Sequence, residues 1–155
     1  MVESLYQEII LDHYRNPEGR GLREPYEAEV HHVNPTCGDE ITLRVHLVGE
    51  GDAATIEDIS YDNQGCSISQ ASASVMYEQL LHHTVAEAMA TQEQFLALMN
   101  SATGPDGDEP DEEALGDAIA FAGVAKYPAR VKCALLSWMA WKDATSQALA
   151  HGGAR

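Results

Sequence analysis

One stretch of the chain alternates strictly between apolar and polar side chains: Ile41-Thr42-Leu43-Arg44-Val45-His46-Leu47. Because successive side chains of a strand point to opposite faces, this alternation predicts a half-buried β-strand whose four apolar residues face the core. Two further extended segments flank it, at 26–33 and 56–63, and the turn at 49–52 leads into the second of them. Connections this short predict a three-stranded antiparallel meander.

The rest of the sequence has the period of helices. A first helix is predicted at 4–15 with Ser4 as its N-cap, and others at 67–81, 84–99, 115–121 and 129–149. Thr84-Val85-Ala86-Glu87 has the pattern of a capping box and opens the third of these helices. Because the strands precede most of the helices, we expect an α+β domain in which about five helices pack on a small antiparallel sheet.

Two features of the second half are expected to serve structure alone. Residues 101–113 are rich in Gly, Pro and acidic residues, which predicts a solvated loop insertion that does no chemistry. Glu112-Glu113 within it fits a solvated face better than a pair of catalytic carboxylates. Trp138 and Trp141 lie three residues apart on the last predicted helix and are expected to pack in the core or at its rim.

Length and composition limit the classes of function. A chain of 155 residues with 45% hydrophobic residues fits one domain over 1–155 with a real core. The formal net charge of −16 would repel phosphate backbones, so a nucleic-acid partner is not expected. No apolar run is long enough to span a bilayer, and the first four residues lack the basic-then-apolar order of a signal peptide. We therefore expect a cytoplasmic protein whose three cysteines form no disulfide framework.

Each cysteine lies at a predicted joint between two elements. Cys37 and Asp39 are two residues apart in the link between the first two strands, so in extended backbone they project to the same side. Gly38 between them allows the backbone to bend toward a shared ion. Cys66 lies where the third strand gives way to a helix, and Cys133 is expected in the first turn of the last helix.

These positions are suited to metal binding and to sulfur chemistry. Helix N-termini and nearby cations favour the thiolate, the form that binds metals and attacks sulfur; Cys66 has the first feature, and Cys133 gains both through Arg130 and Lys132. Three thiolates and one carboxylate make four ligands, the usual number for zinc. They carry more negative charge than the ion neutralises, so we expect Arg130 to contact Asp39 or a thiolate.

The spacing alone leaves other interpretations open. There is no Cys-x-x-Cys pair, so the three cysteines could be unrelated buried residues. The pairs His31-His32 and His82-His83 offer further ligands, but neither lies in a cysteine segment, and exposed polar positions are expected for both. The sequence contains neither a glycine-rich phosphate loop nor a Gly-x-Ser-x-Gly elbow.

Four ordered segments resemble the U-type iron–sulfur cluster assembly proteins, which include the SufU, IscU and NifU N-terminal branches, and the resemblance runs from about residue 5 to residue 141. The segments are Tyr6-Gln7-Glu8-Ile9-Ile10-Leu11-Asp12-His13-Tyr14-Arg15-Asn16-Pro17, Asn34-Pro35-Thr36-Cys37-Gly38-Asp39, Gly65-Cys66-Ser67-Ile68-Ser69-Gln70-Ala71-Ser72 and Arg130-Val131-Lys132-Cys133. The resemblance implies the SufE/IscU-like α+β fold. It also implies that the three cysteines belong to one site.

Three departures from the IscU pattern place the resemblance closer to the SufU branch. Lys132 precedes the third cysteine, where IscU-type proteins carry a histidine. The Leu-Pro-Pro-Val-Lys chaperone-recognition motif is replaced by residues 127–131, which begin Tyr-Pro-Ala. The insertion at 101–113 resembles one that is typical of SufU-type proteins.

The resemblance implies a zinc-dependent sulfurtransferase that accepts persulfide sulfur from the cysteine desulfurase SufS and serves downstream Suf scaffold proteins. A protein with this activity relays sulfur together with a cysteine desulfurase and is not a free-standing enzyme. The expected metal ligands are Cys37, Asp39, Cys66 and Cys133. We expect Cys37 to be the mobile sulfur acceptor, because it lies on a loop while the other two cysteines start helices, and we expect Arg130 to support it.

Two alternatives remain at this point. A scaffold on which a [2Fe–2S] cluster is assembled would also use four protein ligands, so iron or a cluster at the same residues is the second hypothesis. A purely structural zinc site is the third, and it fits less well because such sites are usually richer in Cys and His than one that includes Asp39.

Overall fold

The fold is a three-stranded antiparallel sheet with helices on one face, and it is described here by a computed structural model covering residues 2–35, 38–100 and 115–152. The strands are β1 (Ala28–Asn34), β2 (Asp39–Val48) and β3 (Thr55–Gln64), in the order β1-β2-β3. Strand β2 pairs antiparallel with both neighbours, so Leu43 lies opposite Val30 on one side and Tyr61 on the other. The predicted meander is confirmed.

The alternation along β2 matches its burial, with one exception. Ile41, Leu43 and Val45 are 0–1% exposed, whereas the residues between them are half-buried on the other face. Leu47 is only half-buried, because the register with β3 shifts between His46 and Leu47 and turns the end of the strand. Leu47 still packs against the core and pairs with the buried Ile56, so the core face extends to it with less burial than the pattern predicts.

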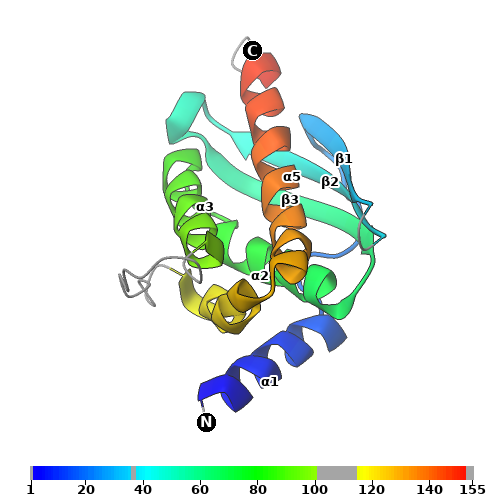
Figure 1. The fold of residues 1–155 in the computed structure, drawn as a ribbon. Coiled ribbons are helices and arrows are strands. Elements are labelled where there is room, and N and C mark those ends of the chain that lie inside the picture. Colours follow the sequence, from blue (N-terminus) through cyan, green and yellow to red (C-terminus); the bar gives the residue numbers. More distant parts are fainter. Residues whose placement is uncertain (1, 36–37, 101–114, 153–155) are drawn as a thin grey trace.

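The helices are α1 (Val2–Arg15), α2 (Ser67–Leu80), α3 (Val85–Asn100), η3 (Gly116–Lys126) and α5 (Pro128–Gly152), with a short turn η1 (Gly51–Ala53) before β3. Figure 1 shows α5 lying across the sheet, α3 beside it, and α1 at the opposite end of the molecule from the C-terminus. The α+β class and the helix order are confirmed. The first helix begins at Val2, so Ser4 is not its N-cap.

The predicted helix at 115–121 is longer and tighter than expected. It is a 3₁₀-helix over Gly116–Lys126. With three residues per turn, Ala118, Phe121 and Val124 fall on the same side, and all three are buried. Ala120 and Ala125 are buried as well, so burial of this helix extends beyond that one side.

Both tryptophans lie in the core, as predicted, and join three helices. Trp138 and Trp141 are completely buried. The Trp138 ring stacks on Phe95 of α3 at 4.3 Å between centroids, and its Nε1–H donates to Ser72 Oγ of α2 at 3.0 Å. On the sheet side, His32 Nε2 lies 2.8 Å from Asp143 Oδ2 of α5. Helix α5 is thereby held between the sheet and the other helices.

The start of α3 has the predicted capping box. The Thr84 N–H donates to Glu87 Oε1 at 2.9 Å, and the Glu87 N–H donates to Thr84 Oγ1 at 3.2 Å. The proposed loop at 101–113, with Glu112-Glu113, lies outside the described residues. Across the described ranges, none of the helices has the length and apolarity that crossing a membrane requires.

Candidate metal centre

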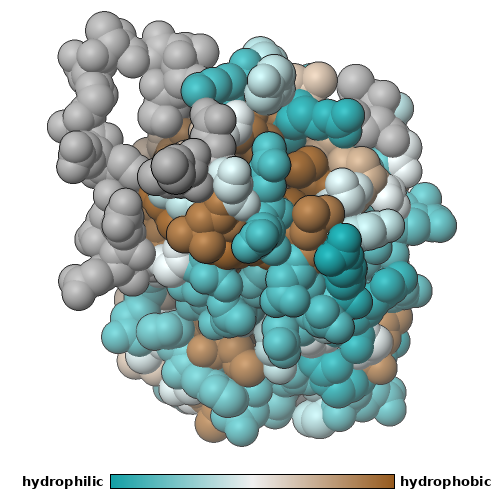
Figure 2. Space-filling view, turned by 90° about the horizontal axis from the view of Figure 1, so that it is seen from below, coloured by the Kyte–Doolittle hydropathy of each residue, from teal (hydrophilic) through white to brown (hydrophobic). Residues whose placement is uncertain are grey.

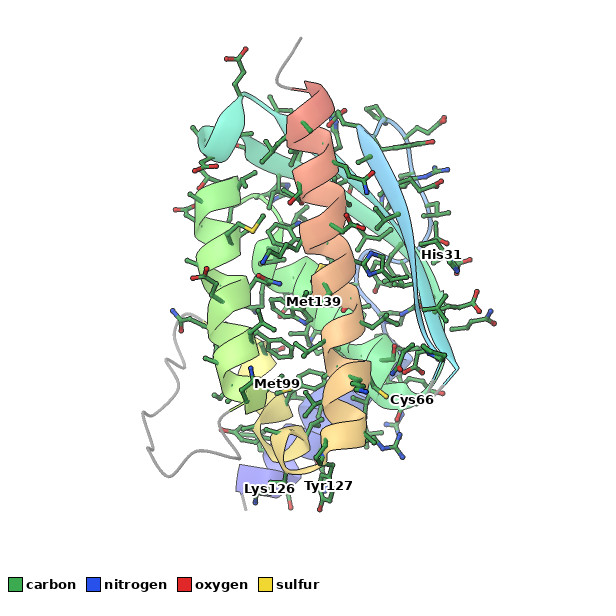
Figure 3. All side chains as sticks on the ribbon, turned by 45° about the horizontal axis from the view of Figure 1, so that its top comes forward. His31, Cys66, Met99, Lys126, Tyr127 and Met139 are labelled. Carbon is green, nitrogen blue, oxygen red and sulfur yellow. The ribbon has the colours of Figure 1, made fainter. Side chains whose placement is uncertain are left out.

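Three of the four predicted ligands lie together at one end of the sheet. One ligand atom each from Asp39, Cys66 and Cys133 lies within 4.8 Å of the other two. Asp39 is the first residue of β2, Cys66 is the N-cap of α2, and Cys133 lies in α5. Figure 3 shows Cys66 beside the first turns of α5, where the sheet ends. The fourth predicted ligand, Cys37, lies outside the described residues.

The backbone around Cys66 is shaped by the Asp39 carboxylate. The Cys66 N–H donates to Asp39 Oδ1 at 2.9 Å, and Cys66 Sγ lies 3.9 Å from Asp39 Oδ2. Gly65 has a φ of +145°, and a Cβ at this position would lie 2.9 Å from the Asp39 Cα and closer still to its carboxylate. Only glycine lets β3 turn into α2 here and leaves room for Asp39.

Asp39 is a buried carboxylate with no ion pair among the residues that the structure describes. Its side chain is fully buried, and within the described part of the chain no Lys, Arg or His forms an ion pair with it. Removing a carboxylate from water costs several kcal/mol unless its charge is balanced. A divalent ion between Asp39 and the two sulfurs would supply that balance, so this donor set fits a metal.

Cys133 lies deeper than the sequence predicts. Helix α5 begins at Pro128, a residue suited to the first helical position, so Cys133 is in the second turn and not the first. The helix dipole acts mainly on the first turn, so it favours a thiolate at Cys133 less than the sequence predicted. The side chain is completely buried, and its sulfur lies 3.7 Å from the Ala129 carbonyl oxygen.

Asn34 is a polar neighbour of the centre that sequence reasoning missed. Its side chain is buried, and its Nδ2 donates to Cys133 Sγ at 3.9 Å. Asn34 also pairs with Asp39 in the sheet, so the connection that carries Cys37 leaves and re-enters the sheet at this centre. Gly38, with φ +72°, closes that connection by donating its N–H to the Asn34 carbonyl at 2.9 Å. The sequence did offer a signal for Asn34, because it is the first residue of the segment Asn34–Asp39 that carries two of the predicted ligands.

Arg130 was expected to contact Asp39 or a thiolate. Among the described residues it forms no ion pair with Asp39, and a contact with a thiolate stays a prediction. Asp39 is fully buried, whereas Arg130 is exposed on the first turn of α5. Lys132 is also exposed. Arg130 instead lines a groove beside the centre.

This groove has a volume of about 530 Å³ and lies between α1, η3 and the starts of α2 and α5. Its walls include Tyr6, Ile10 and Leu11 of α1, and Ser67 next to Cys66. Figure 2 looks at the end of the molecule where α1 lies and shows hydrophobic residues exposed among hydrophilic ones. Tyr127, at the groove, is 62% exposed.

The histidine pairs take no part in the centre. His82 and His83 are exposed, and His31 lies exposed on the outer face of the sheet. His32 differs from the expectation, because its contact with Asp143 makes it half-buried on the core side. None of these four belongs to the group formed by Asp39, Cys66 and Cys133 within the described ranges.

This fold is shared with known proteins. The model of the NifU-like N-terminal domain matches residues 5–134, and the chain belongs to this family.

Two curated relatives match over most of their length. One is the zinc-dependent sulfurtransferase SufU of Bacillus subtilis, 39% identical over 90% of this chain and 88% of its own. Another is the iron–sulfur cluster assembly scaffold protein IscU of Streptococcus pyogenes, which is 38% identical over 90% of this chain and 82% of its own length.

Solved structures agree with the fold. A candidate iron–sulfur cluster assembly scaffold protein for the SUF system from Fervidobacterium islandicum superposes with a TM-score of 0.75 at 35% identity, covering 92% of this chain and 97% of its own. The N-terminal part of a NifU-like protein from Brucella abortus superposes with a TM-score of 0.78 at 23% identity, covering 97% of this chain and 98% of its own. This similarity supports the fold alone.

Proposed function

We propose that this chain is a zinc-dependent sulfurtransferase that accepts persulfide sulfur from a SufS-type cysteine desulfurase for iron–sulfur cluster assembly in the cytoplasm. The observation that carries the proposal is the convergence of Asp39, Cys66 and Cys133 within 4.8 Å around a buried carboxylate that lacks a cationic partner among the described residues. The similarity to the SufU of Bacillus subtilis favours zinc and sulfur transfer for this site.

Zinc would be held by Cys37, Asp39, Cys66 and Cys133, and when bound it would keep the cysteines as thiolates at neutral pH. Two of these sulfurs are fixed by their surroundings. Cys66 is held at the N-cap of α2 by its N–H bond to Asp39, and Cys133 is fully buried in α5. Cys133 cannot move toward a partner without disturbing α5, and the backbone of Cys66 is tied to Asp39.

Cys37 is therefore the proposed sulfur acceptor. Its thiolate attacks the outer sulfur of the persulfide on the desulfurase cysteine. A new S–S bond forms at Cys37 as the old one breaks, and the desulfurase cysteine leaves as a thiolate. Cys37 then carries the persulfide, and no external oxidant or reductant is needed for the transfer. Asp39, a weaker ligand for a soft metal than a thiolate, would make the ligand exchange that frees Cys37 easier.

The groove supplies a surface for the desulfurase beside the site. Arg130 and Ser67 line it, and these residues lie three positions before Cys133 and one after Cys66. A partner segment seated there would lie beside the end of the molecule that holds Cys66. The acceptors downstream of the sulfur would be Suf scaffold proteins.

The second candidate is a scaffold for a [2Fe–2S] cluster, and the 38% identity to the IscU of Streptococcus pyogenes favours it. Four protein ligands serve a cluster as well as a zinc ion. The two candidates predict different behaviour. A sulfurtransferase stimulates the desulfurase, whereas a scaffold retains iron and sulfide.

The test is sulfide production by a SufS-type desulfurase with cysteine and a reductant. We expect the protein to raise turnover on the order of tenfold, and the Cys37→Ala variant to give no increase even where zinc remains bound. Glu93→Ala, which changes an exposed residue of α3 away from the groove, is the control and should stay close to the parent. Bound iron with acid-labile sulfide, and no effect on the desulfurase, would support the scaffold instead.

A further inference from the structure

A second group of metal-binding side chains lies away from the cysteines. One ligand atom each from His13 of α1, Glu78 of α2 and Asp117 of η3 lies within 4.8 Å of the other two. The His13 side chain is 6% exposed, whereas the two carboxylates are each 42% exposed. The imidazole is therefore fixed in the interior while the carboxylates leave a path for an ion from solvent.

The distances suit an octahedral ion. At metal–ligand distances of about 2.1 Å, adjacent ligand atoms lie about 3.0 Å apart and opposite ones about 4.2 Å. His13 Nε2 lies 2.9 Å from Asp117 Oδ2 and 4.0 Å from Glu78 Oε1. Asp117 and His13 thus have the spacing of adjacent ligands, and Glu78 lies close to that of an opposite one. Small rotations of two half-exposed side chains would complete the arrangement.

Ser74 provides the outer hydrogen bond that a histidine ligand needs. Its buried Oγ lies 2.7 Å from His13 Nδ1 and accepts the Glu18 N–H at 2.8 Å. A hydroxyl can donate to Nδ1 or accept from it. In the first case Nε2 carries the proton and donates to Asp117; in the second Nδ1 carries it and the Nε2 lone pair is free for a metal. Ser74 therefore supports either tautomer.

The charges around His13 also favour a cation. Burial raises the pKa of Glu78, and the nearby Asp117 carboxylate raises that pKa further. Two carboxylates that share one site repel each other, and a divalent ion between them would relieve this repulsion. The chain as a whole, with a net charge of −16, attracts cations.

We propose that His13, Glu78 and Asp117 form a second cation site, which binds a first-row divalent ion that prefers nitrogen and oxygen ligands, such as Mn²⁺ or Fe²⁺. One imidazole and two carboxylates, with open positions for water, suit these ions better than a thiolate site does. The site joins α1 to α2 and η3, and α1 and η3 are walls of the groove beside the cysteines. A bound ion would hold these two walls together.

The test is a titration of Mn²⁺ into zinc-loaded protein at pH 7.5, followed by the EPR signal of free Mn²⁺. We expect one saturable equivalent per chain. Asp117→Asn removes a charged ligand but keeps an oxygen that can accept from His13, and it should weaken binding on the order of tenfold or more. His13→Gln should do the same, and its circular dichroism would report whether α1 is still folded.

The control is Asp12→Asn, which removes an exposed carboxylate one position from His13 on the same helix. It should change Mn²⁺ affinity by less than about twofold, because surface charge alone acts weakly at physiological salt. Equal affinities in Asp12→Asn and Asp117→Asn would overturn the proposal and assign the binding to general surface charge. Binding without saturation in the parent protein would overturn it as well. Bound zinc, measured in the same samples, should be the same in all three variants.

Discussion

The two ligand groups of this protein differ in which of their members is buried. At the sheet end, the carboxylate of Asp39 is fully buried and the described residues offer it one N–H, from Cys66, and no ion pair. Beside α1, the imidazole of His13 is buried while Glu78 and Asp117 are 42% exposed. A buried imidazole can be neutral, whereas a buried carboxylate must be neutralised or protonated. We therefore propose that a bound metal contributes more to the stability of the folded state at the first group than at the second.

The largest expected effect is loss of metal when a sulfur at the sheet end is removed. Cys66→Ala and Cys133→Ala should each reduce bound zinc from about one equivalent to roughly a tenth or less, because each removes one of four ligands. Asp39→Ala should lose less, since water can take its place. Metal analysis of the purified variants measures this. A full equivalent of zinc in Cys66→Ala would contradict the proposed centre.

Chelation should separate the two groups by their contribution to stability. A ligand present at a thousand times its dissociation constant stabilises the folded state by about 4 kcal/mol, or on the order of 10 °C in melting temperature for a domain of this size. We expect a loss of this order when zinc is stripped and a much smaller change in Asp117→Asn. Thermal unfolding with and without chelator measures both. If the melting curve is the same after verified zinc removal, the buried Asp39 carboxylate is balanced by other means.

A pair of glycines tests how tightly the backbone holds Asp39. Gly65→Ala and Gly21→Ala share a cost for a side chain at positive φ, of roughly 1 kcal/mol or more. A Cβ at Gly21 meets nothing within 4 Å, whereas one at Gly65 meets Asp39, which adds roughly 1–3 kcal/mol. Gly65→Ala should therefore be the less stable variant in urea and the only one of the two to lose zinc. Equal zinc content would show that Asp39 can shift without cost.

The smallest expected effect concerns the charges beside the groove. Arg130 lines the groove, and Lys132 is exposed two residues along α5. A charge at the edge of a docking surface mainly changes the rate of association. Arg130→Ala should lower sulfur transfer with the desulfurase roughly two- to fivefold, with Lys132→Ala closer to the parent and both folded. A larger loss in Lys132→Ala would move the docking surface away from the groove.

Local patterns in the sequence were enough to predict most helices and strands and the segments that form the site. The alternation at 41–47 determined the central strand, and Thr84 with Glu87 determined the start of α3, because both depend on residues a few positions apart. The positions of Asp39 and Cys66 at joints between elements were also readable from the chain. Whether Cys37 completes the centre stays a prediction.

Only the tertiary structure decided which of these side chains are buried and what lies next to them. Asn34 meets Cys133 across 99 positions of sequence, and His13 meets Asp117 across 104. Contacts at such separations depend on how helices pack on the sheet, and no local period encodes that packing. The same holds for Asp39. Its place in the sequence was evident, but its complete burial without an ion pair in the described structure, and its position beside Cys66 and Cys133, come from the packing of distant segments.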